Sequence, residues 1–226
     1  MDYMQKVDEI LDKLNRGIPV SLARFNDGEM SGIMSPAGTK TVARGDQKVG
    51  MDLKYRLLAA LSHKQKNYYK GIPCPVCYPR FHNEAKMLSN PDYKYLTYAV
   101  VNTNRNWEYF RDRLGPAIGD KRVIWVSGED QNVDVLKNFD INVSHHIKLP
   151  LKNAFGKYYE IKNDQFDGGE VVLLSCGPLG RVLVWNWFSE NPDTSFLEIG
   201  STFDPYTRNV WHRCHLGTLP ACEKCN

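Results

Sequence analysis

A short apolar run at residues 18–25 stops abruptly at Asn26-Asp27-Gly28-Glu29. The run is typical of a buried strand, and Asn, Asp and Gly are the residues of tight turns. We therefore expect Asp27 and Glu29 just past the carboxyl end of a strand, where open α/β sheets bind ligands. Carboxylates in a D-x-E spacing can hold one divalent cation, and the cation can hold a diphosphate. For so short a motif alone, an ordinary polar turn with solvated acids is the commoner meaning.

Strand-like and helix-like patterns alternate along the rest of the chain. Val7, Ile10, Leu11 and Leu14 recur at the spacing of an amphipathic helix, and residues 171–176 form the clearest buried strand. This alternation predicts a Rossmann-like α/β fold with a mainly parallel sheet flanked by helices. The expected helices cover residues 3–16, 47–62, 107–114, 134–139, 153–162 and a segment around 182–187; the expected strands cover 18–25, 95–101, 122–127, 141–149, 171–176 and 196–199.

Length and composition fit one large globular domain. The chain has 226 residues, 42% of them hydrophobic, and a net charge of only +3, which gives no strong electrostatic case for nucleic acid. No apolar run approaches the roughly 20 residues that span a membrane, and residues 1–16 lack the apolar core of a secretion signal. We expect a cytoplasmic protein, in a cell or an infected host. Its single domain, residues 1–226, would include a Cys/Pro-rich loop at 71–80 and a Cys/His-rich tail at 211–226.

Four of the six cysteines form two C-x-x-C pairs, Cys74-Pro-Val-Cys77 and Cys222-Glu-Lys-Cys225. In a reduced compartment two such pairs can build a tetrahedral structural Zn²⁺ site, if the fold joins pairs about 145 residues apart. Free or oxidised thiols near surface turns fit the same pattern. A thioredoxin-like redox role is not expected, because neither pair opens a helix after a clear strand. Alternative ligands near the second pair are His212, Cys214 and His215.

Several turns at expected strand ends, at residues 26–29, 128–130, 176–180 and 200–205, would converge along one edge of a parallel sheet. Gly177 before Pro178 would let backbone approach a ligand, and N–H groups at a helix start can bind phosphate. A plain tight turn is the commoner meaning of this segment alone. It is neither a P-loop nor a dinucleotide G-x-G-x-x-G motif.

Arg24-Phe-Asn-Asp-Gly-Glu29 resembles the R-[FY]-G-D-G-E element of the GT-D-type glycosyltransferases, a family first catalogued as a domain of unknown function. The chain departs from that pattern at Asn26, where the family has Gly, and at Cys176 and Leu179-Gly180. Asn can adopt the left-handed conformation for which such a Gly is usually selected, so we expect the same turn here. Further blocks agree in order over about residues 5–210: Asp46-Gln47 before an apolar helix, Leu149-Pro-Leu-Lys-Asn-Ala-Phe155, Val172-Leu-Leu-Ser-Cys-Gly-Pro178, and Glu198-Ile-Gly-Ser201 with Asp204-Pro-Tyr206.

The resemblance implies a Rossmann-like enzyme that moves a sugar from a nucleotide sugar, expected to be a UDP-sugar, to a hydroxyl acceptor. It places Asp27 and Glu29 at a divalent cation, Mn²⁺ or Mg²⁺, on the donor diphosphate. The acceptor stays open among glycan, protein, lipid and modified nucleic acid, as do the stereochemical outcome and the oligomeric state. Two alternatives remain: a non-catalytic nucleotide-binding or zinc-stapled interaction protein, and a hydrolase or phosphotransferase acting on a nucleotide diphosphate.

The chemistry of such a transfer suggests roles for other residues. Arg24 can add positive charge at the leaving diphosphate, or pair with Asp27 or Glu29. An inverting reaction needs a base, and the candidates are Glu129, Asp130, Glu198 and Asp204, each also acceptable as a surface acid or helix cap. Asn153 suits a ribose or sugar hydroxyl, or an N-cap. The expected donor-binding residues are Arg24, Asn26, Gly28, Gln47 (otherwise on a solvated helix face), Asn153, Gly177 and Pro178; Trp125, Trp185 and Trp187 suit base or sugar stacking but more often core.

Overall fold

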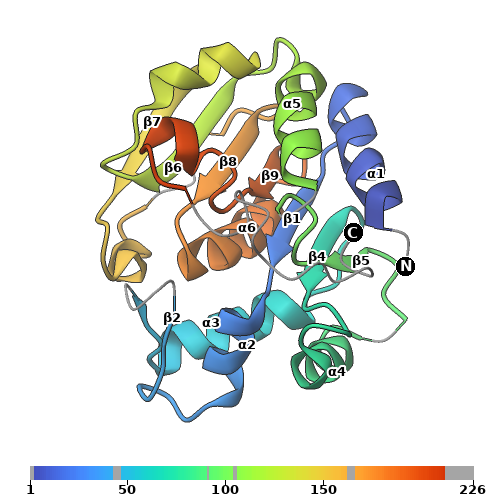
Figure 1. The fold of residues 1–226 in the computed structure, drawn as a ribbon, viewed down its shortest axis with the longest axis vertical. Helices are drawn as coiled ribbons and strands as arrows, with labels where there is room; N and C mark the ends of the chain where they lie inside the picture. Colours follow the sequence, from blue (N-terminus) through green and yellow to red (C-terminus); the bar gives the residue numbers. More distant parts are fainter. Residues whose placement is uncertain (1–2, 43–46, 91, 104–105, 162–165, 212–226) are drawn as a thin grey trace.

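The computed structural model describes residues 3–42, 47–90, 92–103, 106–161 and 166–211 (Figure 1). Seven strands form one sheet in the order β5-β4-β1-β9-β8-β6-β7, and every neighbouring pair is parallel. The expected α/β class with a parallel sheet is confirmed. The strands are β1 (Ser21–Arg24), β4 (Tyr68–Ile72), β5 (Leu96–Tyr98), β6 (Val123–Gly128), β7 (Val143–Leu149), β8 (Val171–Ser175) and β9 (Ser195–Glu198); a separate antiparallel hairpin joins β2 (Thr41–Val42) to β3 (Gln47–Lys48).

Helices cover both faces of the sheet, so the central strands are apolar on both sides. In β8, Val172 and Leu174 join the core on one face, whereas Val171 and Leu173 join the core on the other. The first face is covered by α2 (Asp27–Met34), α3 (Met51–Ser62), α4 (Pro79–Leu88) and α6 (Pro178–Glu190). The second is covered by α1 (Tyr3–Asn15), α5 (Trp107–Ile118), the 3-10 helix η3 (Val133–Phe139) and the short α7 (Asp204–Thr207).

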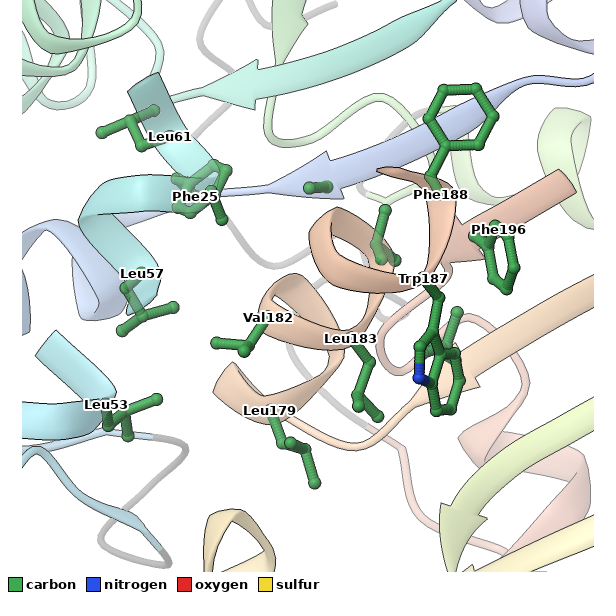
Figure 2. Packing of buried hydrophobic residues seen from close by; sticks show 14 of the residues in the cluster. Phe25, Leu53, Leu57, Leu61, Leu179, Val182, Leu183, Trp187, Phe188 and Phe196 are labelled. Atoms are coloured by element: carbon green, nitrogen blue, oxygen red, sulfur yellow. The ribbon is translucent and has the colours of Figure 1, made fainter. Parts of the chain in front are cut away.

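Helix α6 packs against both the sheet and α3. Figure 2 shows Val182 directed toward Leu57 of α3 and Trp187 beside Phe196 of β9, and the centroids of these two rings are 6.0 Å apart. None of the described helices is long and apolar enough to cross a bilayer.

The last strand in the chain, β9, lies in the middle of the sheet between β1 and β8. Leu197 is paired with Leu22 on one side and with Leu173 on the other. Because all seven strands run in one direction, the carboxyl ends of β1, β9 and β8 lie next to one another at the same edge of the sheet. The chain segments that follow these three strands can therefore build one site.

The sequence patterns missed β4 and α4. Strand β4 contains Lys70, which interrupts the apolar run but is fully buried. Its Nζ donates at 2.9 Å each to the carbonyls of Leu61, His63 and Ser89, at the carboxyl ends of α3 and α4, where helix dipoles favour a cation. Burial lowers the pKa of Lys70 to about 7. The loop expected at 71–80 is reduced to residues 73–78, because β4 ends at Ile72 and α4 begins at Pro79.

Three expected helices also differ in extent. The helix expected at 47–62 begins only at Met51, because residues 47 and 48 pair in the β2–β3 hairpin. The helix expected at 153–162 is only the 3-10 turn η4 (Ala154–Lys157), and the helix expected at 107–114 continues to Ile118.

Gly115 lets α5 approach the end of η3 closely. A Cβ atom at this position would lie 1.8 Å from the carbonyl oxygen of Phe139. We expect Gly115→Ala to lower the free energy of unfolding by about 3 kcal/mol, because helix and loop backbones must separate. Urea denaturation would measure this, with Gly156→Ala as control, since a Cβ at Gly156 meets nothing within 4 Å. Equal stability of the two variants would contradict the prediction.

Candidate functional site

The D-x-E motif lies in the first turn of a helix rather than in an open turn. Helix α2 begins at Asp27, and Asn26 is its N-cap with an extended backbone (φ −97°, ψ −167°). The expectation of a left-handed conformation at Asn26 is therefore wrong. An extended backbone is open to any residue, so this position does not need the ability of Gly or Asn to adopt a positive φ. Glu29 Oε2 accepts the backbone N–H of Asn26 at 3.1 Å, and both acids complement the positive end of the helix dipole.

The two carboxylates have different surroundings. Glu29 is buried, 7% exposed; its Oε1 lies 3.3 Å from Nη2 of Arg181, while its Oε2 accepts the Asn26 N–H. Asp27 is half-buried, and its side chain makes no hydrogen bond or ion pair with any residue that the structure describes. Packing does not require a glycine at position 28, since a Cβ atom added to Gly28 would meet only Val42 Cβ at 3.9 Å. Asp27 is thus the carboxylate of the pair that is open to a ligand.

Behind this motif, two arginines and two glutamates form a buried ionic network. Arg24 Nε donates to Glu198 Oε2 at 2.6 Å, and Arg181 Nη1 lies 3.3 Å from Glu198 Oε1. Arg181 Nη2 contacts Glu29, so the network joins β1, β9, α6 and α2 with no net charge. Burial opposes the charge of Arg181, but the carboxylates of Glu198 and Glu29 raise the pKa of Arg181 above its usual value. This pairing of two positive with two negative side chains is needed for stability, because an unpaired buried charge is costly.

The remaining hydrogen bonds of the arginines fix the strand ends. Arg181 Nε donates to the carbonyl of Arg24 at 2.6 Å, and Arg24 Nη1 donates to Asn102 Oδ1 at 2.6 Å and to the carbonyl of Ala99 at 3.0 Å. The alternative expected for Arg24 was an ion pair with Asp27 or Glu29, but among the described residues Arg24 pairs with Glu198 instead. The sequence patterns missed Arg181. Its signal was a single arginine directly before Val182-Leu183-Val184 in an otherwise apolar helix.

The base candidates fall into different environments. Glu198 is fully buried and held by two guanidinium groups, so the structure corrects its expected role: it is not placed to receive a proton from an acceptor. Asp204 is 5% exposed at the start of α7, with Oδ2 3.8 Å from Nη1 of Arg208. Asp130 Oδ2 accepts Arg208 Nε at 2.8 Å. Glu129 is exposed after β6 and forms no side-chain hydrogen bond or ion pair within the described parts of the chain.

The glycine turn before α6 has the expected unusual backbone. Gly177 has φ +59°, and Pro178 occupies the first turn of α6. The carbonyl of Gly177 accepts a hydrogen bond from Arg181 Nη1. One turn later, a Cβ at Gly180 would lie 3.3 Å from Glu198 Cγ, so the glycine allows α6 to pack on the ionic network.

Gln47 and Asn153 have structural partners. Gln47 is buried; its Oε1 accepts the N–H of Phe155 at 3.1 Å and its Nε2 donates to the carbonyl of Lys48 at 2.9 Å. Neither suggested position for Gln47, on a helix or on a solvated face, is correct. Asn153 is exposed and left-handed (φ +51°), and its Oδ1 accepts the N–H of Lys48 at 3.4 Å rather than capping η4. These contacts fasten the β2–β3 hairpin to η4.

Two of the three tryptophans lie in the hydrophobic core, as expected. Trp125 and Trp187 are buried, and Trp125 Nε1 donates to Gln131 Oε1 at 3.0 Å. Trp185 is half-buried.

The first C-x-x-C pair lies between β4 and α4, with Cys74 buried and Cys77 exposed. The pair does follow a strand, β4, but both cysteines precede the N-cap of α4, Tyr78, so the expectation that this pair does not open a helix stands. Cys222 and Cys225, together with His212, Cys214 and His215, lie outside the described residues. Among the residues that are described, no group of three or more His, Cys, Asp or Glu side chains has an arrangement that could hold a metal.

The fold and this site define a Rossmann-like α/β protein with an open carboxylate at the carboxyl end of a central strand. No protein-family model matches the sequence, and no curated protein matches it. Solved structures do match. One, described as "a new glycosyltransferase (DUF1792) from Streptococcus sanguinis", superposes with a TM-score of 0.66 and 19% identity, over 92% of this chain and 85% of that chain.

A second solved structure is described as showing that the conserved domain of unknown function 1792 "has a distinct glycosyltransferase fold". It superposes with a TM-score of 0.65 and 17% identity, over 91% of this chain and 85% of that chain. A selenomethionine form of this domain gives the same values. The chain therefore shares the fold of these glycosyltransferases over nearly its whole length.

Gly200 gives a direct test of how the ionic network is packed. It has φ +55°, and a Cβ there would lie 2.0 Å from Nη2 of Arg24. We expect Gly200→Ala to lower the free energy of unfolding by about 3 kcal/mol, through the strained backbone and the displaced guanidinium. Gly17→Ala is the matched control, since Gly17 has φ +67° but no atom within 4 Å of a Cβ, and should lose only about 1–2 kcal/mol. Similar losses in urea denaturation would show that Arg24 is not confined by Gly200.

Proposed function

We propose that the protein is a metal-dependent glycosyltransferase that moves a sugar from a nucleotide diphosphate sugar, a UDP-sugar, to a hydroxyl group of an acceptor. One observation carries this proposal: Asp27 offers an open carboxylate at the carboxyl end of central strand β1, in a chain with the fold of solved glycosyltransferases. This is the edge of the sheet where ligands bind in such folds. Fold alone would not be sufficient, because one fold hosts many functions.

The residues fit a cation that protein and substrate hold together. Mg²⁺ usually takes one or two carboxylates plus substrate phosphates and waters, and Mn²⁺ accepts the same oxygen ligands. Asp27 supplies the direct protein ligand, whereas Glu29 is occupied by Arg181 and Asn26 and positions the turn. When bound, the cation would neutralise negative charge on the leaving nucleoside diphosphate.

The other residues act around that site. The buried Arg24–Glu198 pair and Arg181 fix the ends of β1 and β9, so Asp27 is presented from a rigid base. For the proton of the acceptor hydroxyl, we propose Glu129, the base candidate that is exposed and not ion-paired within the described chain. The acceptor class remains open among a glycan, a protein, a lipid and a modified nucleic acid.

The test is release of nucleoside diphosphate from a panel of UDP-, GDP-, ADP- and dTDP-sugars, with Mn²⁺ and with EDTA. We expect one donor, a UDP-sugar, to turn over with metal only. Fast release that no sugar acceptor accelerates would instead indicate a hydrolase or phosphotransferase. Binding of a donor without turnover would indicate a non-catalytic nucleotide-binding protein. Neither binding nor turnover of any donor in folded protein would reject the proposal.

A further inference from the structure

Hydrogen bonds within the protein hold the turn that carries Cys74 and Cys77, without any bound ligand. The N–H of Tyr78 donates to the carbonyl of Cys74 at 3.0 Å, and the N–H of His82 donates to the carbonyl of Tyr78 at 2.8 Å. The ring Nδ1 of His82 lies 2.8 Å from the carbonyl of Pro73. These bonds tie the end of β4 to the first turn of α4, so the backbone that positions both sulfur atoms is held from two sides.

Within this turn, the backbone N–H of Val76 points at a sulfur atom, with 3.4 Å between the nitrogen and Cys74 Sγ. An N–H donor favours negative charge on a thiolate, which is the form that binds a metal. Cys74 is 3% exposed, whereas Cys77 is exposed. The first cysteine is therefore buried with a donor aimed at its sulfur, and the second faces outward from the same turn.

This arrangement argues against a redox dithiol. In redox C-x-x-C motifs the attacking thiolate must be accessible, and a helix N-terminus activates it. Here the amino-terminal cysteine of the pair is buried, and both cysteines precede the N-cap of α4, Tyr78. A turn that fixes two sulfur atoms and leaves one facing outward suits half of a metal site.

A tetrahedral thiolate site needs two more sulfur ligands, and the chain has a second pair at the same internal spacing. Cys222 and Cys225 repeat the C-x-x-C pattern of Cys74 and Cys77. Two such pairs are the ligand set typical of structural zinc. Ten residues separate Trp211 from Cys222 in the sequence, so the two positions are eleven steps apart along the chain, a reach of up to roughly 36–40 Å, comparable with the width of a domain of this length.

We infer that Cys74, Cys77, Cys222 and Cys225 bind one structural Zn²⁺, which staples the carboxyl-terminal segment of the chain to the turn between β4 and α4. The four cysteines bind Zn²⁺ as thiolates, and their protons are released to solvent without any redox step. This zinc site uses none of the residues proposed for sugar transfer, and its metal is not the cation proposed at Asp27. Its role is to add metal-binding free energy to folding.

The experiment is metal analysis of the full-length protein, purified with a reducing agent and without added chelator. We expect one zinc per chain by elemental mass spectrometry, and loss of that zinc in Cys77→Ser and in Cys222→Ser. Cys176→Ser is the matched control and should retain it. Circular dichroism would show that the Cys222→Ser variant still folds.

A second readout identifies the ligands. Co²⁺ in place of Zn²⁺ should give the intense visible and charge-transfer absorption of a tetrahedral four-thiolate site, weakened in each variant of the two pairs. Absence of zinc together with failure to take up Co²⁺ would overturn the inference. So would disulfides found within the pairs, or zinc retained in Cys222→Ser. Because none of these readouts uses turnover, their failure is distinct from failure of the proposed function.

Discussion

Asp27→Asn is expected to lower the rate of sugar transfer by about 10²–10³-fold or more, while the free energy of unfolding stays within about 0.5 kcal/mol. The carboxylate is half-buried and has no partner among the described residues, so the amide is sterically acceptable and breaks no bond seen in the structure. What it removes is the negative charge that would hold the cation. The measurement is kcat/KM for the active nucleotide sugar across a Mn²⁺ titration, together with urea denaturation of the same preparation.

Two further variants show whether the loss of activity is specific to Asp27. Asp134→Asn changes an acid that likewise lies in the first turn of a helix after a strand, and should leave kcat/KM unchanged. Glu29→Gln should differ in kind, because it breaks the contact with Arg181 and so lowers both stability and activity. If Asp27→Asn keeps full metal-dependent turnover, the cation is not held at Asp27 and the assignment of the site is wrong.

Glu198→Gln is expected to cost about 3–5 kcal/mol of stability, the largest effect of any single substitution proposed for this chain. Glu198 is fully buried and contacts both Arg24 and Arg181, so the neutral amide would leave two buried guanidinium groups with only Glu29 to balance them. Urea denaturation, followed by circular dichroism, would measure the loss.

The control is Glu160→Gln, which breaks the exposed pair with Lys157 and should change stability by at most about 0.5 kcal/mol. If Glu198→Gln does not fold, Arg24→Met combined with Glu198→Met tests the same idea. Removing both partners leaves fewer uncompensated charges, so the double variant should be more stable than the sum of single effects predicts. Additive losses would show that the pair is not energetically coupled.

Periodicity alone was sufficient for most of the sheet. The apolar run at 171–174 and the helical spacing from Val7 to Leu14 correspond to β8 and α1. A strand that is buried on both faces and a helix that is buried on one face leave different sequence patterns. It failed at β4, where Lys70 breaks the apolar run. That lysine is compatible with a buried strand only because three carbonyls from helix ends surround it, and no local pattern reveals such a contact.

The candidate site shows a similar division. The position of Asp27 after β1 follows from local sequence, since a strand followed by turn-forming residues is a short-range signal. The role of Glu198 does not, because its partners lie 174 residues away in the chain, at Arg24, and on α6. Acids at strand ends look alike in sequence whether they face solvent or a pair of arginines. Only the tertiary contacts separate Glu129 from Glu198.

The central place of β9 has a consequence for biosynthesis. During translation, β5, β4 and β1 can associate on one side, and β6, β7 and β8 on the other, before residues 195–198 emerge. Until then, β1 and β8 each expose an unpaired, apolar edge, which is the surface through which partly folded chains aggregate. A nascent chain interrupted before β9 therefore cannot close its sheet, and it should depend on chaperones until the last strand of the sheet is inserted.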